Sequence, residues 1–175
     1  MTIRRAASFV SRSGGAVWSC CTHISSPVGR LLLVADEAGL KRICFEGTEE
    51  VPRARSERDP MEVPFRETVL QLESYFEGTL KQFNLPLAPE GTAVQLEVWR
   101  KLIEIPYGST ITYSDLASAM GRPGAARAVG SANGRNPLPI IVPCHRVIGS
   151  DGSLTGYGGG LHIKAFLLNL ERTAR

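Results

Sequence analysis

The pattern of apolar and polar residues predicts three short strands and then a helix in the first half of the chain. Within residues 17–45, apolar segments are separated by turn-like sequences at 26–29 and 36–39, which predicts strand, turn, strand, turn, strand. Apolar residues then recur at helical spacing over 64–77, up to Gly78. This spacing predicts an amphipathic helix whose aromatic residues belong to the core.

The second half has the pattern of short helices joined by turns. Thr92 precedes a segment whose apolar residues share one helical face, and a further helix is predicted over 162–172. Between them, 113–120 and 125–133 are helical segments separated by a tight turn at 121–124. Helix, turn, helix is typical of the helix-turn-helix DNA-binding motif, although many helix pairs share the arrangement.

A chain of 175 residues can form one ordinary domain or two small ones. Residues 46–62 carry charges of mixed sign and indicate a solvated loop, while 82–90, with two prolines, predict an extended segment and then a linker. We therefore expect one domain at 17–90 and a second at 91–175. Residues 1–16 form an N-terminal extension with three arginines and no acidic residue, a composition that fits a transit peptide or a disordered tail.

Composition indicates a globular protein with a basic C-terminal half. Hydrophobic residues make up 43% and charged residues 21%, which excludes extensive disorder, and no apolar run approaches the roughly 18 residues that cross a bilayer. The net charge is +3, but residues 1–91 carry 11 basic and 12 acidic side chains, and residues 92–175 carry 9 and 5. This asymmetry suits a moderate, salt-sensitive affinity for phosphates.

Cys144 is the strongest candidate for a reactive residue. It follows the apolar run 140–143, which predicts a buried strand ending in a proline. A thiol with a pKa of about 8.5 is a poor nucleophile unless a histidine takes its proton and a carboxylate orients that histidine. His145 is adjacent, and Glu171 ends the last predicted helix. From these residues alone, a packed core thiol is the commoner explanation.

The other cysteines, Cys20, Cys21 and Cys44, indicate neither a disulfide framework nor a metal site. With His23 they offer residue types that bind zinc, but adjacent cysteines cannot easily both ligate one ion and no C-x2-C spacing occurs. We therefore expect no metal. A nucleophilic Cys144 requires a reducing compartment, so we expect a cytoplasmic protein, nucleoid-associated in a bacterium or nuclear in a eukaryote.

The region around Cys144 resembles the active site of the O6-alkylguanine-DNA alkyltransferase family. The resemblance covers about residues 23–173 and rests on PCHRV at 143–147, GSLTGYGGGL at 152–161, IPYG at 105–108, TY at 112–113, AARAVG at 125–130 and NP at 136–137. The glycine-dense loop has neither the P-loop nor the dinucleotide-binding spacing. Close approach to a flat ligand explains its glycines better.

The resemblance implies an α+β fold: a small N-terminal α/β domain with an antiparallel, ribonuclease-H-like sheet, and a mostly helical C-terminal domain with the helix-turn-helix. It also implies irreversible transfer of an alkyl group from O6-alkylguanine in double-stranded DNA to Cys144, after the base is flipped out of the stack. Each molecule would act once, as a monomer and without a cofactor. The sequence leaves open whether O4-alkylthymine is also a substrate.

The same resemblance implies roles for the catalytic residues. Cys144 would be activated by His145 through a water, and Glu171 would orient the imidazole. Asn136 would brace the active-site turn, and Tyr113 would face the flipped base and help neutralise the departing guanine.

The residues implied to bind the substrate are Tyr113, Val147, Tyr157, Gly158 and Lys164. The carbonyls of Cys144 and Val147 and the amide of Gly158 would read the guanine edge, and Lys164 would lie near the pocket rim. Arg146 follows the motif, and we expect it to form a structural salt bridge.

Arg127 matches the family residue that enters the duplex and fills the gap left by the flipped base. An ordinary phosphate contact is the simpler alternative. The other residues implied to contact DNA are Thr112, Ala125, Ala126, Gly130 and Ser131. Small residues on this helix would equally suit close packing within the protein.

Two other functions stay open on the residues alone. A DNA-binding module without chemistry would use the helix-turn-helix, but it would lack the nucleophilic cysteine that this chain keeps. A hydrolase built on the same cysteine, histidine and carboxylate would need an oxyanion hole and would not explain the helix-turn-helix. The chain departs from the family pattern at Val94, His162 and Ile163, which bear on substrate range only.

Overall fold

The computed structural model describes residues 8–9, 19–47 and 56–174, and the chain divides into two compact units, Met1–Glu90 and Gly91–Arg175. Of the expected extension 1–16, only β1 (Ser8–Phe9) lies in the described part. Within the described ranges, none of the helices has the length and apolar character needed to span a membrane.

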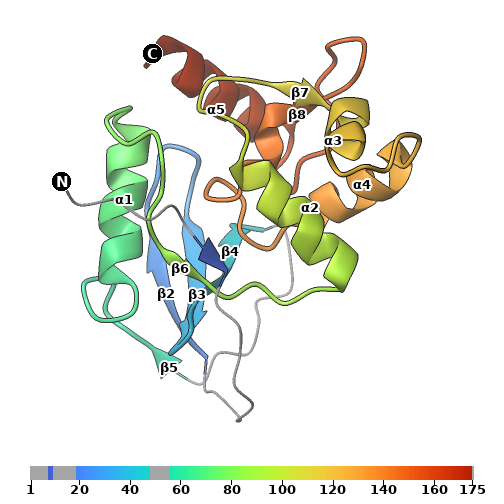
Figure 1. Cartoon of the computed structure of the whole chain (residues 1–175). Helices are drawn as coiled ribbons and strands as arrows, with labels where there is room; N and C mark the ends of the chain where they lie inside the picture. The colour runs from blue at the N-terminus through green and yellow to red at the C-terminus, as the bar shows by residue number, and fades with distance from the viewer. Residues whose placement is uncertain (1–7, 10–18, 48–55, 175) are drawn as a thin grey trace, which may run out of the picture. The chain divides into compact units, whose positions relative to one another are not determined.

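The centre of the sheet in the N-terminal unit is the antiparallel meander that the sequence predicts. Strands β2 (Cys20–Ile24), β3 (Leu31–Asp36) and β4 (Gly39–Phe45) pair in this order (Figure 1). Two backbone hydrogen bonds between Ser26 and Gly29, of 3.1 and 3.0 Å, close the first turn. All six residues of β3 are buried, as expected for a strand that is paired on both edges.

Short strands extend this sheet in the parallel sense, which the sequence did not predict. β5 (Ser56–Glu57) pairs with β2, β6 (Pro86–Leu87) pairs with β4, and β1 pairs with β6. The resulting strand order is β1-β6-β4-β3-β2-β5. β6 lies in the segment 82–90 that was predicted as extended, but strands of two residues carry no periodicity that would predict their pairing.

The predicted amphipathic helix is α1 (Arg66–Phe76), which lies alongside the sheet in Figure 1. Its buried face includes Val69, Leu72 and Tyr75. The helix ends just before Gly78, whose φ of 75° is a left-handed conformation that glycine adopts without a steric penalty.

The C-terminal unit contains the predicted helices, with ends that differ by one residue from the prediction. They are α2 (Ala93–Ile103), α3 (Tyr113–Ala119), α4 (Ala126–Gly134) and α5 (Leu161–Thr173). The α3–α4 pair is the predicted helix-turn-helix. α2 packs on α4, and the indole N–H of Trp99 donates a 2.9 Å hydrogen bond to the carbonyl of Ala132.

Capping boxes explain why two of these helices begin where they do. The Thr92 hydroxyl accepts from the N–H of Gln95, and the Gln95 side chain accepts from the N–H of Thr92. Thr112 and Asp115 repeat the arrangement at the start of α3. Each box satisfies N–H groups that have no partner within the helix, so both threonines fix a helix start.

The apolar run before Cys144 is not the buried strand that the sequence predicts. Residues 138–142 form a buried turn, and the strand β8 (Val147–Ile148) comes after Cys144 and pairs in parallel with β7 (Ile111–Thr112). A short apolar run does not distinguish a buried strand from a buried turn. Backbone N–H groups that could bond to a neighbouring strand are also missing here, because prolines occupy positions 137, 139 and 143.

Asn136 organises this turn. Its Nδ2 donates to the carbonyl of Val142 at 2.8 Å, and its Oδ1 accepts from the N–H of Leu138 at 3.0 Å. Ile140 is fully buried and has a φ of 76°, a conformation that β-branched residues rarely adopt. Packing and the Asn136 bonds therefore hold a strained turn that leads directly into Cys144.

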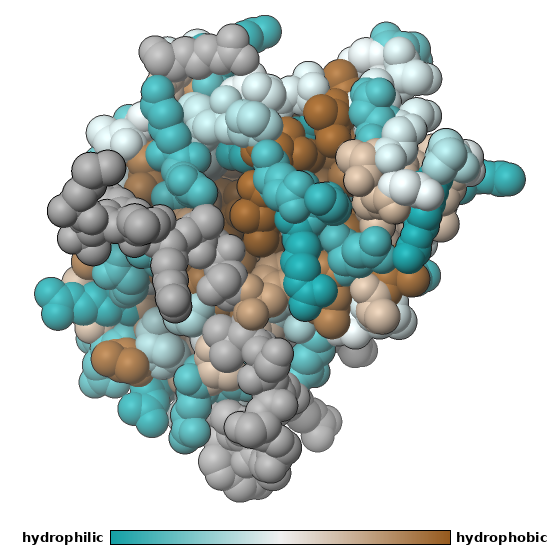
Figure 2. Space-filling view, in the orientation of Figure 1, coloured by the Kyte–Doolittle hydropathy of each residue, from teal (hydrophilic) through white to brown (hydrophobic). Residues whose placement is uncertain are grey.

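Hydrophilic residues dominate the face shown in Figure 2, with hydrophobic residues between them. The exposed large apolar side chains of the described residues are Met61, Val63, Leu70, Val94, Leu161 and Phe166. Single exposed apolar residues are normal on a protein surface, so none of them by itself marks a site.

Candidate active site

Cys144 and His145 belong to a single turn of 3₁₀-helix, η1 (Cys144–Arg146), whose side chains are buried. From this turn, Nε2 of His145 lies 2.8 Å from Oε1 of Glu171 on α5. Both side chains are fully buried. The structure thus brings the predicted histidine and carboxylate into contact beside the predicted nucleophile.

Several hydrogen bonds fix the Glu171 carboxylate. Arg146 donates to both of its oxygens, through Nε and Nη2, at 2.9 Å each, and the N–H of Gly108 donates to Oε2 at 3.0 Å. Arg146 Nη1 donates to the carbonyl of Ile105 at 2.6 Å. The expectation that Arg146 forms a structural salt bridge is confirmed, and the pair fixes the position of the carboxylate that contacts His145.

The protonation states of Glu171 and His145 follow from this environment. Burial acts to raise the pKa of Glu171, but hydrogen bonds from His145 and Arg146 outweigh burial and hold that pKa well below its usual range. An ionised carboxylate only accepts, so His145 Nε2 carries the hydrogen and Nδ1 presents a lone pair. Burial also lowers the pKa of His145, which keeps the ring neutral at pH 7.

The remaining ring nitrogen of His145 is positioned to accept a proton. Nδ1 is buried and has no hydrogen-bond partner among the described protein atoms. Buried nitrogen acceptors are normally satisfied. An unsatisfied one next to a cysteine is the arrangement that a general base requires.

Cys144 is a thiol, and not a thiolate, in the free protein. Its side chain is almost completely buried, and burial raises the pKa of the thiol to about 11. A hydrogen bond from the Asn136 side chain and the positive charge of Lys164 act in the opposite direction. The sulfur therefore becomes a nucleophile only when a base removes its proton during the reaction.

The family resemblance predicts that Lys164 lies near the pocket rim, but the structure shows it elsewhere. It is fully buried, and its ammonium donates to the carbonyl of Val147 at 2.7 Å and to that of Thr155 at 2.8 Å. A lysine on an amphipathic helix usually reaches water with its charged end, but here carbonyl oxygens replace water. Burial lowers the pKa of Lys164.

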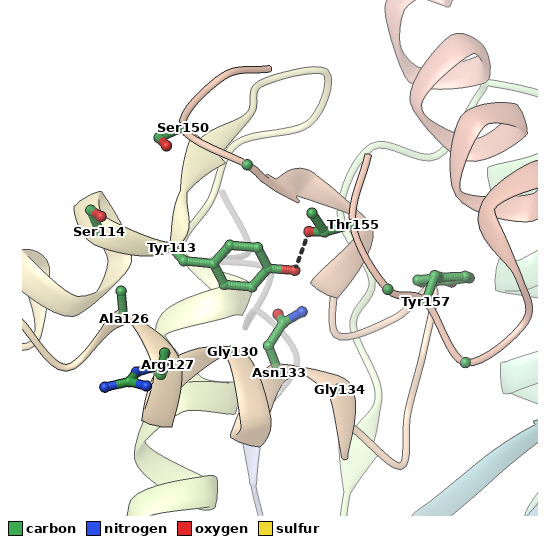
Figure 3. A pocket seen from close by; sticks show the side chains of 13 residues that line it. Tyr113, Ser114, Ala126, Arg127, Gly130, Asn133, Gly134, Ser150, Thr155 and Tyr157 are labelled. Carbon is green, nitrogen blue, oxygen red and sulfur yellow. Dashed lines mark hydrogen bonds between the residues drawn. The ribbon is translucent and has the colours of Figure 1, made fainter. Parts of the chain in front are cut away.

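A pocket of about 720 Å³ lies between the start of α3, helix α4 and the loop that precedes α5 (Figure 3). Its volume is within the range of small-molecule sites. Across it, the Thr155 hydroxyl donates a 3.0 Å hydrogen bond to the phenol oxygen of Tyr113. The lining consists of Tyr113, Ser114, Ala126, Arg127, Gly130, Asn133, Gly134, Gly149, Ser150, Thr155, Gly156, Tyr157 and Gly158.

This pocket collects some of the predicted residues and not others. Tyr113, Tyr157 and Gly158 line it, whereas Cys144, Val147 and Lys164 are buried and do not belong to its lining. Their roles toward a substrate stay predictions.

Three residues expected to contact DNA also line the pocket: Ala126, Arg127 and Gly130. Figure 3 shows the Arg127 guanidinium pointing away from the pocket's tyrosine. The Thr112 hydroxyl is already bonded to Asp115 in the helix cap, Ala125 precedes α4, and Ser131 is exposed on α4. These contacts with DNA also stay predictions.

Two polar residues of the pocket, Asn133 and Thr155, were not predicted from the sequence. Asn133 is 3% exposed, its Oδ1 has no hydrogen-bond partner among the described protein atoms, and its amide is directed toward Tyr113 and Thr155 in Figure 3. The sequence held a signal for Asn133, since it shares a helical face with Ala126 and Gly130. Thr155 gave no such signal, because a loop hydroxyl meets its partner only through tertiary structure.

The N-terminal cysteines have ordinary structural surroundings. Cys20 Sγ donates to the carbonyl of Ala35 at 3.5 Å, and His23 Nδ1 lies 3.0 Å from Glu57 Oε1. Across the described part of the chain, no group of three or more His, Cys, Asp or Glu side chains is arranged to hold a metal ion. Cys20 and Cys21 are free thiols.

The C-terminal unit thus combines a helix-turn-helix with a buried cysteine, histidine and glutamate. These two features define the class of protein. Family models give this class a name. Residues 93–173 match the DNA binding domain of 6-O-methylguanine DNA methyltransferase, and residues 20–89 match the ribonuclease-like domain of the same protein. The chain belongs to the O6-methylguanine DNA methyltransferase family.

Individual relatives agree with this assignment. The methylated-DNA–protein-cysteine methyltransferase of Methanosarcina barkeri is 55% identical over 151 residues, which cover 85% of this chain and 94% of the relative. That of Haemophilus influenzae is 46% identical and covers 86% of this chain and 85% of its own length. The crystal structure of Mycobacterium tuberculosis OGT in complex with DNA superposes with a TM-score of 0.82 at 45% identity, covering 89% and 94% of the two chains. The family and the mixed fold expected from the sequence are thus confirmed.

Proposed function

We propose that this chain is a methylated-DNA–protein-cysteine methyltransferase that repairs O6-alkylguanine directly, with Cys144 as the acceptor. The sulfur of Cys144 attacks the alkyl carbon, the bond from that carbon to O6 breaks, and its electron pair leaves with guanine. The proton lost by Cys144 balances the one that guanine gains. The products are a thioether on the protein and an unmodified base, so each molecule acts once and needs no cofactor.

The observation that carries this proposal is the proton-accepting state of His145 beside a thiol. A water between Cys144 and His145 passes the thiol proton to Nδ1, and the bond from Nε2 to ionised Glu171 stabilises the imidazolium that forms. The raised thiol pKa is no obstacle, because a sulfur with a high pKa is the stronger nucleophile once deprotonated. Asn136 supports the same sulfur by a hydrogen bond and braces the turn that leads into it.

Other residues bind the guanine base and stabilise the negative charge that develops on it when the bond to O6 breaks. Tyr113 lines the pocket and donates a hydrogen bond to guanine as negative charge develops on the departing base. The carbonyl of Cys144 accepts from the N–H of Val147, and that of Val147 accepts from Lys164. Each carbonyl keeps a second lone pair for the guanine edge, and the N–H of Gly158 supplies a donor from the loop.

DNA approaches through the helix-turn-helix. The target atom is inaccessible inside the stack, so the nucleotide rotates out into the pocket beside α4. Arg127 then enters the duplex in its place, and the small residues Ala125, Ala126, Gly130 and Ser131 let α4 come close to the DNA.

O4-alkylthymine also carries its alkyl group on an oxygen of the base, so the same chemistry makes it a second substrate. The protein acts as a monomer. A cysteine that must stay reduced to react requires a reducing compartment, so we propose a cytoplasmic location.

The decisive experiment is intact-protein mass spectrometry after incubation with a duplex that carries a single O6-methylguanine. We expect the wild type to gain one methyl group, to saturate at one per chain, and to return guanine in the DNA. Cys144→Ser keeps the size of the side chain and removes the thiol, so it should bind the duplex and gain no mass.

The two rival functions give different results in this experiment. Duplex binding without any mass change would indicate a recognition module without chemistry. Repeated turnover without a lasting adduct would indicate a hydrolase. Either result would refute the proposed transfer.

A further inference from the structure

Thr155 connects two parts of the site that the proposed function treats separately. Its hydroxyl donates to the phenol oxygen of Tyr113 at 3.0 Å, and its carbonyl accepts from Lys164 at 2.8 Å. Lys164 also binds the carbonyl of Val147 at 2.7 Å. A continuous series of hydrogen bonds therefore runs from the strand that follows Cys144 to the phenol of Tyr113.

The bond from Thr155 limits where the hydrogen of Tyr113 can point. A phenol has one hydrogen and two lone pairs, and conjugation keeps the hydrogen in the ring plane, which leaves two orientations. Thr155 occupies one of these positions as a donor. Figure 3 shows Thr155 on one side of the phenol oxygen and Asn133 on the other. With Thr155 as the donor, the hydrogen of Tyr113 takes the other orientation, away from Thr155.

Both partners in this bond are held in place. Tyr113 is the first residue of α3, whose start is fixed by the Thr112–Asp115 capping box. A Cβ on Gly130 would lie 3.5 Å from the Tyr113 ring, so α4 provides a close surface beside that ring. Thr155 lies on an exposed loop but is anchored through its carbonyl by the fully buried Lys164. The bond is therefore a defined feature of the pocket.

We propose that Thr155 is a positioning residue that holds Tyr113 as a hydrogen-bond donor aimed at the departing guanine. This inference rests on the proposed function, in which Tyr113 stabilises the negative charge that forms when the bond to O6 breaks. A donor that is oriented before the reaction stabilises developing charge without reorganisation. Thr155 acts through its hydrogen bond to the phenol of Tyr113.

The test measures single-turnover methyl transfer from a duplex with one O6-methylguanine, together with duplex affinity. Thr155→Val keeps the shape and removes the donor, and we expect transfer to slow about tenfold with unchanged affinity, a loss below the full effect of a general acid. Thr155→Ser restores the donor and should recover most of the rate. Ser153→Ala is the matched control, because it removes a hydroxyl of the same loop that binds Asp151 and not Tyr113.

A double-mutant cycle separates positioning from a general loop effect. Tyr113→Phe removes the phenol, so adding Thr155→Val to it should cause no further slowing. The inference is overturned if Thr155→Val transfers at the wild-type rate, or if it slows the Tyr113→Phe variant as much as it slows the wild type. A wild type that transfers no methyl group at all would instead refute the proposed function itself.

Discussion

At the scale of single residues, buried polar atoms without protein partners coincide with the proposed chemistry. Asn133 Oδ1 and His145 Nδ1 are both buried and have no hydrogen-bond partner among the described protein atoms. Such atoms are rare because an unsatisfied buried polar group costs about 1–3 kcal/mol. A cost of that size is consistent with groups that are kept for function and not for stability.

Asn133 allows this cost to be measured. Replacing it with leucine, of similar size, removes the unsatisfied oxygen, so we expect Asn133→Leu to raise the free energy of unfolding by about 1 kcal/mol in denaturant titrations. Methyl transfer should slow, because Asn133 lines the pocket. Asn169→Leu is the control, since the Asn169 oxygen is exposed and accepts from Arg172. A destabilised Asn133→Leu protein would contradict this account.

The residue scale is also where sequence reasoning was least complete. The resemblance named Cys144, His145 and Glu171, because their types and spacing are visible in the chain. It placed Lys164 wrongly and did not name Thr155, since both depend on which carbonyl or hydroxyl lies within reach after folding. Contacts between side chains and a distant backbone leave no periodic signal in a sequence.

At the scale of elements, apolar patterns predicted the strands β2, β3 and β4 and the helix α1 correctly, but the short apolar run before Cys144 misled. The helix that follows Thr92 was predicted with that threonine at its start, and the structure shows Thr92 as its N-cap. The run at 140–143 was predicted as strand because apolar and β-branched residues were visible, whereas the Asn136 bonds that make this region a turn were not. A hydrophobic pattern therefore needs enough length to show a period, which this run lacks.

The two caps allow the effects of weakening α2 and α3 on stability and on activity to be compared. Thr92→Ala and Thr112→Ala should each lower the free energy of unfolding by about 1 kcal/mol, the usual cost of losing a helix cap. Only Thr112→Ala should slow methyl transfer as well, because the helix it caps begins with Tyr113. Thermal unfolding and single-turnover transfer measure the two effects. Equal slowing in both variants would show that the cap affects activity only through overall stability.

At the scale of the whole molecule, the fold class was predicted from the family resemblance, and the order and composition of the chain agree with it. Strands precede helices along the chain, the helical half carries the excess of positive charge, and the observed units divide at Glu90 and Gly91. The parallel edge strands of the sheet could not be predicted, because they depend on partners distant in sequence. The stability of the whole chain, in contrast, has a pH dependence that can be derived from two buried groups.

We expect the protein to lose stability as pH falls below about 6.5, the usual pKa of histidine in an unfolded chain. Burial lowers the pKa of folded His145, so between these two pKa values the unfolded state alone binds the proton. The free energy of unfolding then falls by about 1.4 kcal/mol for each pH unit. Glu171 extends the loss below about pH 4.3, where the unfolded carboxyl is protonated and the folded one, with its lowered pKa, stays ionised.

His145→Gln isolates the first of these two contributions, because glutamine can still donate to Glu171 but does not titrate. Denaturant titrations at pH 7 and pH 5 should show a smaller loss of stability for His145→Gln than for the wild type, by about 1–2 kcal/mol. The sign is fixed by the direction of the shift: a histidine whose pKa were raised on folding would make the wild type gain stability over the same interval. Parallel losses in both proteins would mean that His145 is not held neutral, and would remove the basis for treating it as the base that deprotonates Cys144.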